Sequence, residues 1–85
     1  MKSVEFIVGK TNTGFDAHRE ENGLIVAVTT GSNLAELKNN ILESYNLYQE
    51  DRGRKEISID QIALTFDVPS FFEFYNIINA KALSA

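Results

Sequence analysis

Acidic side chains are the residues of this sequence best suited to chemistry, because several converging carboxylates can hold two metal ions about 4 Å apart for phosphoryl transfer. The candidates for such a nuclease site are Glu5, Asp16, Glu36, Glu43 and Asp67. By strand parity, Glu5, Asp16 and Asp67 share one face of the predicted sheet, whereas Glu36 and Glu43 lie on the solvent side of a predicted helix. Solvated acids on an open sheet face would give the same pattern. We favour that interpretation and predict no enzyme activity and no catalytic, cofactor-binding or metal-binding residue.

Two further groups of polar residues have ordinary interpretations. His18 is the single histidine and the chain has no cysteine, so no other imidazole or thiolate can complete a metal site with it. Arg52, Arg54 and Lys55 form a basic cluster, but neighbouring acids oppose its field within a Debye length. We therefore predict a surface histidine and a set of cations at a helix C-terminus.

Composition narrows the function classes. The chain has 85 residues, enough for one domain, and a net charge of −4 that should repel nucleic-acid phosphates. The absence of cysteine excludes a disulfide scaffold and fits a reducing compartment. No apolar run approaches the roughly 20 residues that a bilayer requires. We expect a cytoplasmic protein that contacts neither nucleic acid nor membrane directly.

In the first thirty residues, apolar and polar side chains alternate as they do in β-strands, and these strands must position the candidate side chains. Residues 4–8 have the period-two pattern of a half-buried strand, and residues 11–14 form a turn. A second strand is predicted over 15–20, followed by Asn22-Gly23, a strong hairpin signal. A third strand covers 24–29, so the pattern predicts a three-stranded meander.

An amphipathic helix follows this meander. Asn33 and Glu36 form a capping pair, and Gly53 ends the helix. Apolar residues then repeat at spacings of three and four along one continuous stripe: Leu34, Leu37, Ile41, Tyr45 and Tyr48. This stripe predicts the helix face that packs on the sheet.

The remainder of the chain predicts a strand and a second helix. A fourth strand covers residues 61–68, after a bend at residues 60–61 where the alternation changes parity. Pro69 and Ser70 open a helix that is apolar around much of its circumference. Because so small a domain cannot bury all of this surface, we predict a homodimer interface formed by Phe71, Phe74, Tyr75 and Ile78.

These elements predict an α+β fold with the order β-β-β-α-β-α. Rules for hairpins and right-handed crossovers give a small mixed sheet of strand order 3-2-1-4. The first helix should cover the face that holds Val4, Phe6, Phe15, Val26, Leu64 and Phe66. Residues 1–68 form the α/β domain, and residues 69–85 form the C-terminal helix, which serves as an interface or as a linker to a further DNA-binding domain.

Residues 4–51 resemble the N-terminal domain of HicB-type antitoxins. The similarity lies in an Asp- and Gly-containing turn before an aromatic residue, a short turn ending in Gly, a Gly before a capped helix, and a Leu-Tyr pair near the end of that helix. The corresponding segments here are Thr11-Asn12-Thr13-Gly14-Phe15-Asp16-Ala17, Glu20-Glu21-Asn22-Gly23, Gly31-Ser32-Asn33-Leu34-Ala35-Glu36-Leu37 and Glu43-Ser44-Tyr45-Asn46-Leu47-Tyr48. One departure is that Glu20-Glu21-Asn22-Gly23 replaces the family's proline-rich turn.

The resemblance implies a partly degraded ribonuclease H-like fold that is not an enzyme and that neutralises a small RNA-cleaving HicA-like toxin. Residues 71–83 resemble the linker and first helix of a helix-turn-helix domain, which many such antitoxins carry. We therefore expect a non-catalytic HicB-like domain that binds its toxin and mediates dimerisation. The alternative is a dimerisation or ligand-sensing domain of a helix-turn-helix regulator without a toxin partner.

Overall fold

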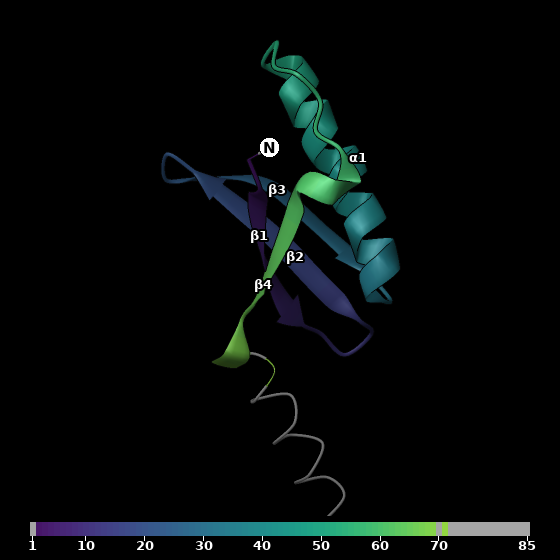
Figure 1. Cartoon of the computed structure of the whole chain (residues 1–85). Coiled ribbons are helices and arrows are strands. Elements are labelled where there is room, and N and C mark those ends of the chain that lie inside the picture. The colour runs from purple at the N-terminus through teal and green to yellow at the C-terminus, as the bar shows by residue number, and fades with distance from the viewer. Residues whose placement is uncertain (1, 70, 72–85) are drawn as a thin grey trace, which may run out of the picture.

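A four-stranded mixed sheet with one long helix on one face forms the fold of the computed structural model, which describes residues 2–69 and 71 (Figure 1). The strand order is β3-β2-β1-β4, with β1, β2 and β3 antiparallel and β4 parallel to β1. Both the α+β class and this order confirm the sequence prediction. The elements are β1 (Val4–Lys10), β2 (Phe15–Glu21), β3 (Leu24–Gly31), α1 (Leu34–Asp51), the 3-10 turn η1 (Ile59–Gln61) and β4 (Ile62–Phe66).

Both hairpins of the meander depend on residues that tolerate unusual backbone geometry. Asn22 and Gly23 have φ values of 52° and 80°, the pair of positive angles that a two-residue turn between twisted strands requires. At the other hairpin, Gly14 lies against β3, where a Cβ atom would stand 2.3 Å from the carbonyl oxygen of Gly31. Glycine is therefore required there to let the chain approach β3 so closely.

Helix α1 runs back along β3, the strand that precedes it. Asn33 caps it, because its side-chain oxygen accepts a 2.8 Å hydrogen bond from the backbone N–H of Glu36. Gly31 allows the first turn to sit directly on the sheet, since a Cβ there would lie 2.6 Å from the backbone nitrogen of Leu37. Further along, Asn40 donates to the carbonyl of Thr30 at 2.7 Å, so the helix also satisfies part of the edge strand.

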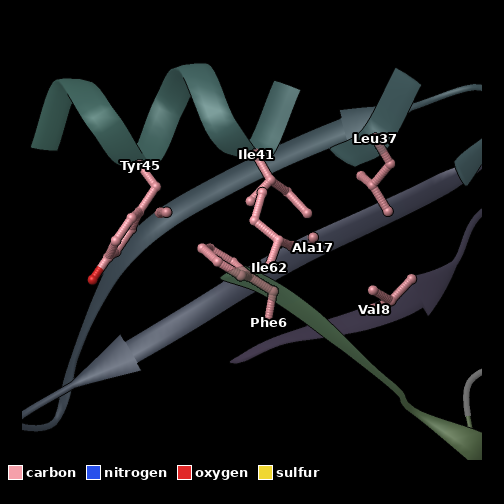
Figure 2. Close-up of a cluster of buried hydrophobic side chains, with 8 residues drawn as sticks. Phe6, Val8, Ala17, Leu37, Ile41, Tyr45 and Ile62 are labelled. Carbon is pink, nitrogen blue, oxygen red and sulfur yellow. The ribbon is translucent and has the colours of Figure 1, made fainter. Parts of the chain in front are cut away.

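The core lies between α1 and the sheet (Figure 2). The ring of Phe6 meets that of Tyr45 edge-on, with centroids 5.4 Å apart. Full burial of one large apolar side chain stabilises the fold by about 1.5–3 kcal/mol. The buried apolar residues are Phe6, Val8, Ala17, Ala27, Leu37, Ile41, Tyr45 and Ile62.

Val26 packs against the core, as predicted, but β3 contains a bulge that the prediction lacks. Arg19 pairs with Ala27 and Glu20 with Ile25, so the ladder contains a bulge at Val26. The bulge places Ala27 in the buried position, while Val26 is only partly buried against the core. Beyond the bulge the alternation is shifted by one residue from the predicted pattern.

The segment after the helix also differs in detail from the prediction. The expected bend is the 3-10 turn η1, and β4 is shorter at both ends than residues 61–68. Phe66 shares the inward parity but is 43% exposed, because it lies at the end of the strand. Of the predicted second helix, only Pro69 and Phe71 lie among the described residues. Within residues 2–69 and 71, no helix combines the length and apolar character needed to cross a membrane.

Candidate functional site

The three sheet acids that could have formed a nuclease site do not converge. Asp16 pairs with Gly9, which is four residues from Glu5 along β1, a separation of about 13 Å at the usual rise per strand residue. Asp67 follows β4, and its backbone N–H donates to the carbonyl of Val8. Within the described part of the chain, no three His, Cys, Asp or Glu side chains lie together as a metal site would require.

The two helix acids have separate surroundings. Glu36 stabilises the start of α1, because its carboxylate accepts two hydrogen bonds from Ser32. The Ser32 hydroxyl donates at 2.8 Å and the Ser32 backbone N–H at 3.3 Å. Glu43 is exposed and lines a shallow hollow between α1 and β3, with Thr29, Asn40, Ser44 and Leu47. Both acids lie on the solvent side of the helix, as predicted, and Glu36 is engaged in capping.

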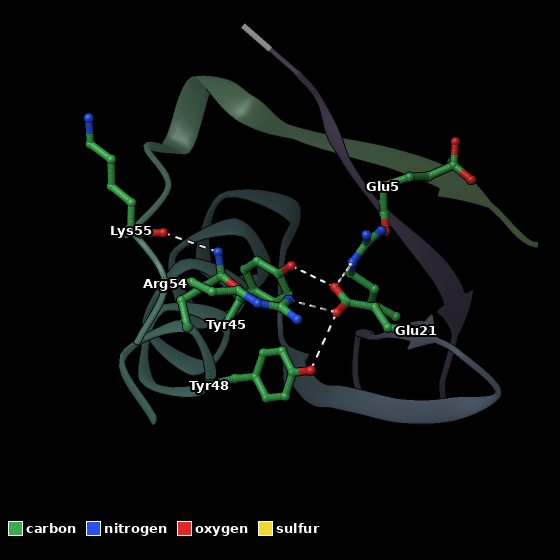
Figure 3. Close-up of polar contacts among 8 residues, drawn as sticks. Glu5, Glu21, Tyr45, Tyr48, Arg54 and Lys55 are labelled. Carbon is green, nitrogen blue, oxygen red and sulfur yellow. Dashed lines mark hydrogen bonds and ion pairs between the residues drawn. The ribbon is translucent and has the colours of Figure 1, made fainter. Parts of the chain in front are cut away.

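A network of hydrogen bonds and ion pairs around Glu21 is the strongest polar feature of the described chain (Figure 3). The carboxylate accepts from Tyr45 Oη at 2.7 Å and pairs with Arg19 Nε at 2.7 Å. Arg54 Nη1 lies 3.3 Å from its other oxygen, which also accepts from Tyr48 Oη at 3.4 Å. The network therefore joins the end of β2 to the last turns of α1 and to the loop that follows.

The electrostatics of this network follow from its contacts. The hydrogen bond from Tyr45 and the pairing with Arg19 and Arg54 outweigh burial and lower the pKa of Glu21 to about 2. Burial, followed by the hydrogen bond to this anion, raises the pKa of Tyr45. Glu21 therefore remains ionised near neutral pH. We call Glu21 and its partners Arg19, Tyr45, Tyr48 and Arg54 the clamp, because they join β2 to α1.

In the basic cluster, Arg54 belongs to the clamp and Arg52 contacts it. Arg52 forms the C-cap of α1, as predicted, and Gly53 follows with a φ of 66°. The guanidinium groups of Arg52 and Arg54 lie 5.3 and 5.9 Å from the ring centroid of Tyr48. Arg54 pairs with a distant acid on β2 rather than with its sequence neighbours.

Sequence reasoning misses the role of Glu21. The pattern assigns it to a turn, although Arg19 two positions earlier shares its strand face and two tyrosine hydroxyls on the helix stripe need partners. These signals indicate polar groups near the core. They do not indicate that the end of β2 meets the end of α1.

The sheet face opposite α1 is the surface on which the remaining candidates meet. Strand pairing places Thr65, Ile7, His18 and Val28 in one row across all four strands, which we call the neutral row because none of the four is Asp, Glu, Lys or Arg. On one side of this row lie Glu5, Glu20 and Ile25, and on the other lie Asp16 and Thr30. We call this surface the open face, because no described helix or strand packs on it.

Exposure and charge distinguish the open face from an ordinary solvated surface. Ile7, Ile25 and Val28 are 37%, 60% and 65% exposed. The strand residues that point to this side include no Lys or Arg, and its acids form no ion pair with another described residue. His18, predicted to lie on the surface, sits half-buried in the neutral row between Ile7 and Val28. The open face thus combines unpaired negative charge with exposed aliphatic side chains.

Of the predicted dimer residues, Phe71 alone lies in the described part of the chain. Its ring centroid is 6.1 Å from that of Phe15 and 5.6 Å from that of Phe66, so it extends the core of its own domain. Phe74, Tyr75 and Ile78 lie outside the described residues. Dimerisation stays a prediction, and Phe74→Glu tests it by light scattering better than a change at Phe71, which would damage the domain itself.

Comparison with known proteins adds no relative: no family model, no curated protein and no solved structure matches this chain.

Proposed function

We propose that this chain is a non-catalytic protein-binding domain, and that it acts as a HicB-like antitoxin that neutralises a small basic RNA-cleaving toxin in the cytoplasm. The observation that carries the proposal is the open face, a sheet surface with exposed Ile25 and Val28 and with acids but no Lys or Arg among its described strand residues. An apolar area bordered by charges of one sign is typical of a surface that binds another protein.

Protein binding accounts for this surface better than chemistry does. A hydrolytic site needs acids, bases or nucleophiles within hydrogen-bond reach of one reacting atom. Here Glu5 and Asp16 lie about 13 Å apart along the sheet. Glu21, whose pKa is lowered to about 2, uses both of its oxygens to join β2 to α1 and the following loop.

The sign of the charge indicates the class of partner. A protein that binds RNA must carry Lys and Arg, because phosphate contacts supply much of the affinity. An acidic surface attracts such a protein, speeds the encounter and keeps RNA away from the same surface. The resemblance of residues 4–51 to HicB-type antitoxins indicates the same partner.

Co-expression tests this function directly. The chain is produced together with any small basic protein encoded beside it, and growth, co-purification and cleavage of total RNA are measured. We expect the neighbour to arrest growth alone, to cleave RNA, and to lose both activities in a complex with this chain. A stable complex without growth rescue, or the absence of a complex with such a neighbour, would contradict the antitoxin proposal and favour the regulator alternative.

A further inference from the structure

The uncharged and acidic residues of the open face are arranged in rows, and this arrangement indicates how a partner segment would be oriented on the sheet. The neutral row crosses four strands, a distance of about 14 Å at the usual strand spacing. Acids flank the row on both sides along β2, where Glu20 and Asp16 each lie two residues from His18, about 7 Å away, and on one side along β1, where Glu5 lies two residues from Ile7. A segment laid along β2 would therefore place its apolar side chains over carboxylates at both ends, whereas a segment laid across the strands keeps them on the row.

We infer that the open face binds a basic amphipathic segment of the partner protein that lies across the strands. Its aliphatic side chains would cover Ile7 and Val28 in the neutral row. Lysine or arginine side chains on one flank would reach Glu5 and Glu20, and those on the other flank would reach Asp16. A row of this length matches about 10 residues of α-helix, or nearly three turns. This inference rests on the proposed function and specifies how the partner is held.

Charge complementarity decides between this occupant and two others. A second copy of the chain would bring Glu5, Glu20 and Asp16 against the same three acids, and like charges across an interface oppose association. A nucleic acid would meet carboxylates along its phosphates. A cationic segment gains from both flanks, because Glu5, Glu20 and Asp16 form no ion pair with another described residue.

A peptide titration on the full chain tests the surface with a defined probe. The probe is a fluorescent peptide of about 14 residues with leucines at helical spacing and lysines beside them, and the control peptide has glutamate in place of lysine. Anisotropy gives the dissociation constant, and amide chemical shifts of labelled protein locate the contact. We expect shifts at Ile7, His18, Val28 and Thr65 and no binding of the glutamate peptide.

Two matched variants give the decisive comparison. Val28 on the open face and Leu47 on α1 are 65% and 60% exposed, so Val28→Lys and Leu47→Lys change charge and exposed apolar area alike. We expect Val28→Lys to weaken lysine-peptide binding by about tenfold or more and Leu47→Lys by less than about twofold. Far-ultraviolet circular dichroism verifies that both variants are folded. Equal effects, or peptide-induced shifts on α1, would overturn the inference.

A charge-only pair gives an independent measurement. The double variant Glu5→Gln and Glu20→Gln removes two charges from the open face, and Glu43→Gln with Glu50→Gln removes two from α1. The first pair should lower affinity and flatten its salt dependence more than the second. Light scattering adds another check, because a dimer that Val28→Lys dissolves would assign the face to a second copy and refute the cationic partner.

The outcomes for the surface and for the function are separable. A neighbouring toxin that is neutralised equally well by the Val28→Lys and Leu47→Lys variants would refute this surface and leave the antitoxin function intact. A lysine peptide that maps to the neutral row, in a chain that neutralises no neighbour, would support the surface and refute the function.

Discussion

Replacement of Glu21 by glutamine should expose how much of the stability resides in the clamp between β2 and α1. Glutamine keeps the shape and can still accept from Tyr45, but it loses the charge that pairs with Arg19 and Arg54. The fall of the Glu21 pKa from 4.5 to about 2 sets an upper bound of about 3–4 kcal/mol on the stabilisation by the ionised form. Solvent reaches the exposed Arg54 side of the pair, so we expect a loss of about 1–2 kcal/mol.

The stabilisation by Glu21 should increase with pH. Because folding lowers the pKa of Glu21, the stabilisation is complete above the unfolded value of 4.5 and disappears as the pH falls toward about 2. Urea unfolding of wild type and Glu21→Gln should therefore differ most at pH 6–7, about two units above that value, and should converge near pH 2.

Glu20→Gln is the matched control, since Glu20 is the exposed neighbour on the other face of the same strand. We expect its unfolding free energy to stay within about 0.5 kcal/mol of wild type. Equal losses in the Glu20 and Glu21 variants, or a Glu21→Gln deficit that persists unchanged at pH 2.5, would show that the charge of the clamp contributes nothing.

Three further changes probe how the sequence builds the fold, each measured by thermal and urea unfolding. Gly31→Ala should lower the free energy of unfolding by about 3 kcal/mol, because the new methyl group would lie 2.6 Å from the backbone of α1. Gly23→Ala should lower it by about 1 kcal/mol, through its positive φ alone. Equal losses in the two variants would disprove the close approach of α1 to Gly31. Asn46→Ala should cost about 1–3 kcal/mol, because the amide makes hydrogen bonds of 3.0 and 2.8 Å with the carbonyl and N–H of Ile57, and an unchanged midpoint would mean that water replaces them. Asn33→Ala should cost about 1 kcal/mol through loss of the helix cap, with Asn33→Ser restoring most of it.

The elements and their order could be predicted because each depends on neighbours in the sequence. Asn22-Gly23 defines a hairpin by its backbone angles, and the pair Asn33 and Glu36 defines a helix start by one hydrogen bond. The apolar stripe of α1 then leaves a single face for packing, and connection rules place β4 beside β1. Each of these features depends on residues close together in the sequence and not on tertiary contacts.

The β3 bulge and the Glu21 network escaped prediction because both depend on long-range fit. Period-two alternation cannot show where a strand gains an extra residue, so it does not reveal that Ala27 is buried next to the partly buried Val26. The partners Arg54 and Tyr45 come from segments 33 and 24 residues away from Glu21. Only the packed arrangement of α1 against β2 brings these groups together.

The register of β2 explains why the clamp and the open face coexist in one small domain. Alternate residues put Arg19 and Glu21 on the helix side and Asp16 and Glu20 on the other. A slip of one residue would bury the carboxylates of Asp16 and Glu20 and expose the clamp, so the buried face specifies the register strongly. Because the bulge lies in β3 rather than β2, this alternation is uninterrupted. The arginines are held on the helix side, and the acids of the open face remain available to a cationic partner.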